Sequence, residues 1–200
     1  MTAYDVAVAT ITQEHHALGV VMEMLQRLLV DIGKQHAEAD FALLAAALYY
    51  IDDFPERCHH PKEDEHLFKT LRSRTSAFDA ALDDLQAEHV RSAQMNGYLQ
   101  RALVHYQGGA PEGYQRFKNA VDAYAGMLRD HMRKEEELLA QARDRLIEQD
   151  WQEIAAAFDA NDDPLFGANR REEFRKLYLR IVNQLPRKMR LQLQRHEREQ

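Results

Sequence analysis

Two histidine–glutamate pairs are the clearest chemical feature of this sequence. His59 precedes Glu63 by four residues within CHHPKEDEH, and His131 precedes Glu135 by the same interval. On an α-helix, this interval places both side chains on one face, one turn apart, so a single metal site can use both. A lone pair of this kind is usually a surface pair. Two such pairs, each beside a single histidine on the adjoining helix, favour a metal site.

Those single histidines interrupt apolar stripes. His15 and His89 occupy positions where their helices otherwise place Leu, Ile or Phe, and His131 and Glu135 also lie on an apolar stripe. Burying an ionised carboxylate without a partner is very costly, and a multivalent cation compensates several such groups at once. The predicted metal ligands are His15, His59, Glu63, His89, His131 and Glu135.

Four imidazoles and two carboxylates, without a thiolate, suit iron or manganese, and zinc less distinctively. Each carboxylate can bridge two ions and four histidines leave two for each, so a dinuclear centre fits this set better than a single ion. His60 lies about 100° around a regular helix from His59. Distortion at Pro61 would be needed to turn both rings inward, so His60 stays open as a second-layer residue or an alternative ligand.

Four amphipathic helices must position these residues. The helical stripes predict one helix ending at Gly33 and a second over about residues 39–72, with a kink or break at Pro55 and Pro61. A third helix is expected to be capped by Ser76, and a fourth to open at Pro111. Short connections favour an all-α, antiparallel up-down-up-down four-helix bundle over residues 1–149.

Residues 150–200 are predicted to form a helical extension packed on the bundle, ending in a basic tail. Its apolar stripe comprises Phe174, Leu177, Tyr178, Ile181 and Leu185.

The composition excludes several classes of protein. A chain of 200 residues suits one domain, and its formal charge of −7 argues against general nucleic-acid binding. Cys58 is the single cysteine, so no internal disulfide is possible. The N-terminus lacks the pattern of a secretory signal, and the apolar run at residues 41–51 is too short to span a bilayer. We therefore expect a cytoplasmic protein without a membrane span.

The order of His15, His59-x-x-x-Glu63, His89 and His131-x-x-x-Glu135 resembles the haemerythrin-like, or HHE cation-binding, family over roughly residues 8–145. The resemblance implies a four-helix bundle that holds two non-haem iron ions with an oxo or hydroxo bridge, in preference to manganese or zinc. Members of this family bind dioxygen, respond to oxygen, nitric oxide or iron, decompose peroxide, or assist iron–sulfur repair.

One departure from the oxygen carriers bears on function. Those proteins have a fifth histidine one turn from the third-helix ligand, whereas here Leu85 and Ala93 flank His89 at that distance. The leading hypothesis is a di-iron protein that binds or senses dioxygen, nitric oxide or hydrogen peroxide. The alternatives are an iron-responsive regulatory or interaction module and an iron–sulfur-repair type of iron protein. No separate acid or base identifies itself, so the sequence leaves open whether turnover follows binding.

Overall fold

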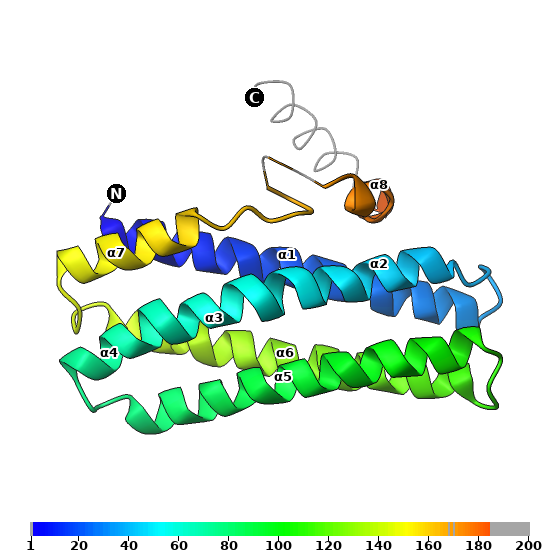
Figure 1. Cartoon of the computed structure of the whole chain (residues 1–200), viewed down its shortest axis with the longest axis horizontal. Helices are drawn as coiled ribbons and strands as arrows, with labels where there is room; N and C mark the ends of the chain where they lie inside the picture. Colours follow the sequence, from blue (N-terminus) through cyan, green and yellow to red (C-terminus); the bar gives the residue numbers. More distant parts are fainter. Residues whose placement is uncertain (1, 168, 170, 185–200) are drawn as a thin grey trace.

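The computed structural model describes residues 2–167, 169 and 171–184, and within these ranges every regular element is helical. Four long rods lie side by side, and the shorter C-terminal helices lie on one face of them (Figure 1). The first rod is α1 (Ala3–Gly33), the third is α5 (Asp79–Gln107) and the fourth is α6 (Gly113–Ala142). The expected all-α class is confirmed.

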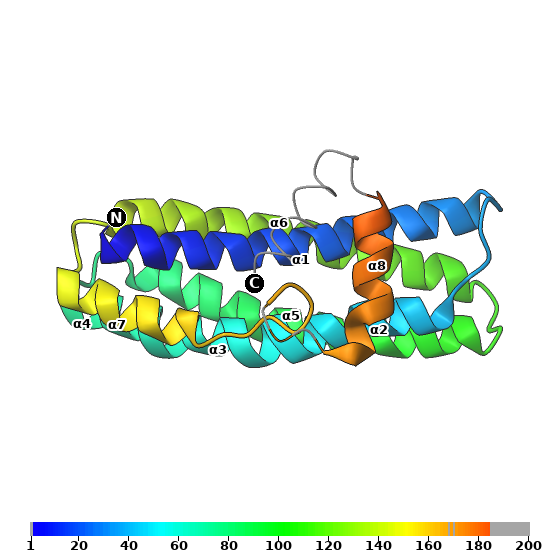
Figure 2. The same ribbon diagram turned by 90° about the horizontal axis from the view of Figure 1, so that it is seen from above.

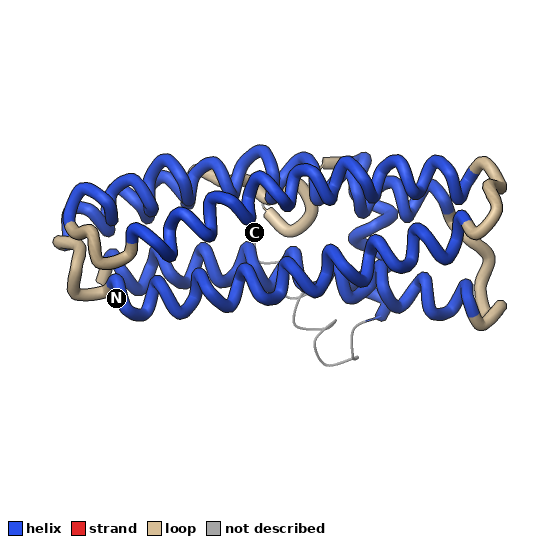
Figure 3. The backbone as a smooth tube through the Cα atoms, turned by 90° about the horizontal axis from the view of Figure 1, so that it is seen from below, coloured by secondary structure: helices blue, strands red, loops and turns tan. Residues whose placement is uncertain are grey.

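The second rod is one helical run over residues 41–74, but it is not a regular α-helix. It consists of α2 (Phe41–Ile51), the π-helix η1 (Asp52–His59), α3 (His60–Lys62), the π-helix η2 (Glu63–Phe68) and α4 (Lys69–Arg74). Figure 3 shows helix continuing through the whole rod. We call α1 with this rod the first helix pair, and α5 with α6 the second.

The π-helical turns change how the two prolines act. Pro55 and Pro61 lack a backbone N–H and would leave gaps in a regular α-helix. Instead the turn widens, and the His60 N–H donates to the carbonyl of Pro55, five residues back. Of the expected kink or break, the break is absent, because the helix continues through both prolines with a locally widened turn, as is common at functional sites.

Helix ends follow local chemistry, with two corrections. Thr2 and Asp5 form a capping box at the start of α1, which ends at Gly33 as expected. Ser76 is not the cap of the third helix, because α5 begins at Asp79, whose N–H is bonded to the Ser76 carbonyl. Pro111 does not open α6 either. Glu112 adopts a left-handed φ of 56°, and the helix begins after it.

Two apolar clusters fill the bundle at different levels along its length. One includes Leu25, Leu48, Leu99 and Val121, and the other includes Ile11, Phe68, Leu82 and Leu139. On every rod the predicted metal ligands lie, in sequence, between the residues of these two clusters. The four rods therefore bring the ligands to one level, with apolar packing on both sides.

The C-terminal segment lies against the first helix pair. Helix α7 (Glu148–Asp159) runs beside α1, and α8 (Arg175–Gln184) crosses the bundle after the short 3₁₀ turn η3 (Glu172–Phe174) (Figure 2). Phe174, Leu177 and Ile181 are buried in the cluster of Leu25, and Tyr178 packs against it partly buried. Leu185 and the basic tail lie outside the described residues. Within the described part, no helix is long and apolar enough to cross a membrane.

Candidate metal centre

All six residues predicted as ligands are buried and meet at one level of the bundle. Glu63 and Glu135 have no exposed surface, and the four histidines are between 2% and 6% exposed. Together with His60, they form two groups in which one potential ligand atom of each residue lies within 4.8 Å of the others. The first group is His15, His59, Glu63 and Glu135, and the second is His60, Glu63, His89 and His131.

Glu63 faces both groups of histidines. Its Oε1 lies 3.2 Å from His59 Nε2 and 3.7 Å from His15 Nε2, whereas its Oε2 lies 3.3 Å from His89 Nε2. Two ligand atoms that bind one ion at right angles, each about 2.1 Å from it, are about 3 Å apart. The spacing around Glu63 is therefore compatible with one ion on each side of the carboxylate.

Glu135 has the same arrangement from the opposite helix pair. Its Oε2 lies 3.2 Å from His15 Nε2, and its Oε1 lies 3.1 Å from His131 Nε2 and 3.4 Å from His89 Nε2. Each carboxylate thus directs one oxygen toward His15 and its neighbours and the other toward His89 and its neighbours; we call these buried histidines and glutamates the cluster. A bridging carboxylate needs this orientation, and an ordinary surface i,i+4 pair does not.

His60 also points into the cluster. It is 4% exposed, and its ring stacks on that of His89 with centroids 4.3 Å apart. The widened turn η1 ends at His59, which permits two consecutive rings to face the interior. Burial lowers the pKa of His60, and Glu56 only partly offsets this effect. His60 therefore favours the neutral imidazole, which is the form that binds metal.

A carboxylate lies behind three of the histidines at hydrogen-bonding distance. Nδ1 of His59 is 2.6 Å from Glu14, Nδ1 of His131 is 3.0 Å from Glu88, and Nδ1 of His89 is 3.2 Å from Asp64. An ionised carboxylate can only accept, so each ring carries its proton on Nδ1 and leaves Nε2 free for a metal. Carboxylate–histidine pairs of this kind are typical behind metal ligands, where they fix ring orientation.

The other two histidines have looser contacts of the same type. Nδ1 of His60 lies 3.5 Å from Glu56, and Nδ1 of His15 lies 3.9 Å from the half-exposed Glu136.

Sequence reasoning missed these partners, although a signal for two of them was present. Glu14 and Glu88 immediately precede His15 and His89 in the sequence, but each contacts a histidine on the neighbouring rod. Asp64 follows Glu63 directly, and its side chain is about one-third exposed. Glu63 faces inward while Asp64 supports His89 from outside, in agreement with the expected register of the second rod.

A polar network extends from His60 into the apolar core. Glu56 accepts from the hydroxyl of Ser92 and from that of Tyr124, the latter over 3.1 Å. Ser92 and Asn96 are buried, and they occupy the gap in the apolar stripe of α5 between His89 and Leu99. This network was not expected, because hydroxyl and amide groups on a helix carry no distinctive spacing.

The electrostatics of the cluster require positive charge. Burial raises the pKa of Glu63, but neighbouring histidines, His59 first, hold that pKa well below its usual range. Burial lowers the pKa of His15, yet pairing with the carboxylates of Glu135 and Glu63 outweighs it and raises the pKa to about 9. Similarly, burial is outweighed at His59 by Glu63 and Glu14, which raise its pKa to about 10. Protons or metal ions can supply this charge.

Several inward atoms have no hydrogen bond. Both carboxylate oxygens of Glu63, Oε2 of Glu135 and Nε2 of His131 are buried in this condition. Unsatisfied buried polar atoms are rare and costly in folded proteins, so a cluster of them needs an explanation. Metal ions would satisfy all of these atoms together.

Comparison with known families agrees with this geometry. The model of the hemerythrin HHE cation binding domain matches residues 6–142. The chain belongs to this family. The matched range contains every residue of the hemerythrin-type cluster and ends with α6, so α7 and the segment after it lie outside the match. Membership means a cation-binding domain, and the two buried histidine–glutamate groups are where a cation would bind. No curated protein matches the chain.

Proposed function

We propose that this chain holds two non-haem iron ions and binds or senses dioxygen, nitric oxide or hydrogen peroxide. The observation that carries the proposal is the orientation of Glu63 and Glu135, each with one oxygen toward either group of histidines. Nitrogen and oxygen donors without a thiolate favour iron or manganese. A dinuclear iron pair in such a set supplies open coordination positions and electrons for a small ligand.

The proposed ligand set is asymmetric. His15 and His59 would bind one ion, and His60, His89 and His131 the other. Glu63 belongs to both groups, and Glu135, which belongs to the first, also reaches His89 and His131 with Oε1. His60 supplies the fifth imidazole that Leu85 and Ala93 do not provide. Because an ion beside His15 would receive one histidine fewer, it would keep more room for a small ligand, which is expected on that side.

The surrounding residues protect and orient this centre. Phe68 stacks on His89 with ring centroids 5.6 Å apart, and Phe158 from α7 lies 5.9 Å from the ring of His59. These rings help to exclude water, which strengthens the electrostatic interactions inside. The carboxylates of Glu14, Asp64 and Glu88 keep the Nδ1 protons in place, so the Nε2 lone pairs stay directed inward.

The proposal retains an antiparallel up-down-up-down bundle. The order of the two apolar clusters supports it. Along α1 and α5 the cluster of Ile11 and Leu82 comes first, whereas along the second rod and α6 it comes last. Rods that alternate in direction would produce this reversal and bring the ligands to one level.

The decisive experiment is elemental analysis of protein purified without added metal. About two irons per chain are expected, with a Mössbauer spectrum that contains two inequivalent sites. One zinc per chain, or no metal, would contradict the proposal. Stopped-flow mixing of the reduced protein with dioxygen, nitric oxide and peroxide then identifies the ligand, and the absence of a spectral change with all three would exclude small-ligand chemistry.

A further inference from the structure

The two helix pairs contain the same short motif and use it differently. The second pair contains HMRKE, and there Lys134 donates to Glu88, which in turn accepts from His131. A lysine from the ligand-bearing helix thus holds the carboxylate that orients the metal-binding ring. All three residues belong to α5 and α6, so no residue outside the four rods takes part.

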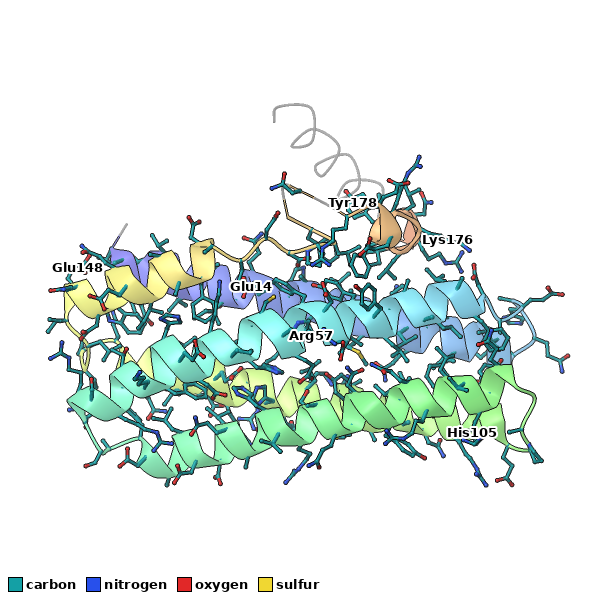
Figure 4. All side chains as sticks on the ribbon, in the orientation of Figure 1. Glu14, Arg57, His105, Glu148, Lys176 and Tyr178 are labelled. Carbon is teal, nitrogen blue, oxygen red and sulfur yellow. The ribbon has the colours of Figure 1, made fainter. Side chains whose placement is uncertain are left out.

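The first pair contains the matching HHPKE, but its lysine is engaged elsewhere. Lys62 donates to the backbone oxygen of Ala157 on α7 over 2.7 Å. The carboxylate of Glu14 is held instead by Asn161, whose side-chain amide lies 2.9 and 3.2 Å from its two oxygens. Figure 4 shows Glu14 on α1, below the segment that leads from α7 to α8.

We propose that Asn161 is a positioning residue of the metal centre, and that residues 160–167 hold the bundle more tightly when iron is bound. This inference rests on the proposed iron centre and goes beyond it, because the segment lies outside the range matched by the family. In this proposal, residues 160–167 help to position a metal ligand as well as cover the bundle.

The contacts form a short chain from the segment to the ligand. Asn161 donates to the carboxylate of Glu14, which is 8% exposed. The same carboxylate lies 2.6 Å from Nδ1 of His59. Tyr50 anchors the same segment through a 2.9 Å bond to Asp163. The amide of Asn161 is neutral, so Glu14 keeps a full charge for His59, whereas Lys134 neutralises Glu88.

Coupling between iron and the segment must act in both directions. If docked Asn161 improves the orientation of His59 for the metal, then metal binding stabilises docking by the same free energy. Loss of a partner behind a metal ligand typically weakens metal binding 10- to 100-fold. Residues 160–167 are therefore expected to become more accessible when iron is removed.

The test compares Asn161→Ala with Tyr50→Phe in the iron-loaded full chain. Both variants remove side-chain hydrogen bonding that holds this segment, but only Asn161 contacts Glu14. Iron transfer to a strong chelator is expected to be about tenfold faster in Asn161→Ala and within about twofold of wild type in Tyr50→Phe. Asn161→Asp, which places a carboxylate against Glu14, should also release iron faster. Equal release rates in Asn161→Ala and wild type would overturn the inference.

Two further measurements separate positioning from simple stability. Chymotrypsin cleavage at Phe166 should be slower with iron than without it in wild type, and this difference should vanish in Asn161→Ala. Glu14→Gln should release iron faster, and adding Asn161→Ala to it should have little further effect. Additive effects would exclude a route through Glu14. A wild-type protein without iron would overturn the proposed function as well, whereas normal iron with unaltered Asn161 variants would overturn this inference alone.

Discussion

The two helix pairs turn similar sets of histidine and glutamate side chains inward with different backbone conformations. In each pair one helix supplies a single histidine preceded by a glutamate, and the other supplies a histidine and a glutamate one turn apart. The regular helix α6 turns His131 and Glu135 inward and leaves the neighbouring Met132 partly exposed. The second rod widens into π-helix around Pro55 and turns His59, His60 and Glu63 inward.

This difference shows how a bundle can obtain an asymmetric site from a nearly repeated motif. A regular helix presents one ligand per turn to a given centre, because consecutive residues are about 100° apart. A π-helical turn relaxes that limit at the cost of regular hydrogen bonding. The first pair therefore contributes an additional histidine, and it also depends on a residue from outside the bundle, Asn161, to hold Glu14.

The largest effect is expected from the two inward-facing glutamates, one in each helix pair. Glu63→Ala and Glu135→Ala should each reduce iron to near zero, because each change would remove a ligand from both of the proposed ions at once. Iron content and visible absorption are the measurements, and exposed Glu65→Ala is the control. A variant that retains one iron after either change would show that the carboxylate does not bridge.

Asp64 sharpens the same comparison. It lies behind His89 and does not enter either group of potential ligands, so Asp64→Ala should weaken iron binding without abolishing it. Loss of iron in Asp64→Ala combined with its retention in Glu63→Ala would mean that the register of the second rod is wrong.

The next largest effect concerns His60, the residue that distinguishes the pairs. His60→Ala should lower iron toward one per chain, since the ion beside His89 and His131 would lose one of three histidines. Met132→Ala, at the corresponding place on α6, should leave iron content unchanged. The two Mössbauer components should become unequal in the His60 variant, and two unaltered components would remove His60 from the ligand set.

A smaller effect is expected from the carboxylates behind the rings. Glu14→Gln and Glu88→Gln each retain an oxygen that can accept from Nδ1 but lose the negative charge. Iron affinity should fall about tenfold in both. Competition with a chelator gives the affinities. A fall in one variant alone would show that the two pairs are not equivalent in this respect.

The six inward-facing residues could be predicted from the sequence, because regular spacing indicates which residues share a face of a helix. It could not give the orientation of His60, since whether Pro55 breaks a helix or widens it depends on how the surrounding rods hold the backbone. The roles of Glu14 and Glu88 could not be predicted, because their targets lie on neighbouring rods. Asn161 is more distant still, because its contact with Glu14 depends on the path of the chain after α7.

The smallest expected difference between iron-free and iron-loaded protein is in how their stability depends on pH. In the iron-free state the pKa of His15 is raised to about 9 and that of His59 to about 10, because pairing with Glu63, Glu135 and Glu14 outweighs burial. A histidine with a raised pKa contributes stability that is complete below about pH 6.5, its unfolded value, and is lost as the pH rises through the folded value.

Iron-free protein should therefore lose stability between about pH 7 and pH 10, and iron-loaded protein should not, because metal ions replace the protons. Each 1 kcal/mol lost lowers Tm by about 2–4 °C in a chain of this size. Calorimetry of both forms across this range measures the effect. His15→Gln should flatten the dependence of the iron-free form, whereas Ala in place of exposed His16 should not. A Tm of the iron-free protein that rises with pH would show that the carboxylates, and not the histidines, hold the protons of this cluster.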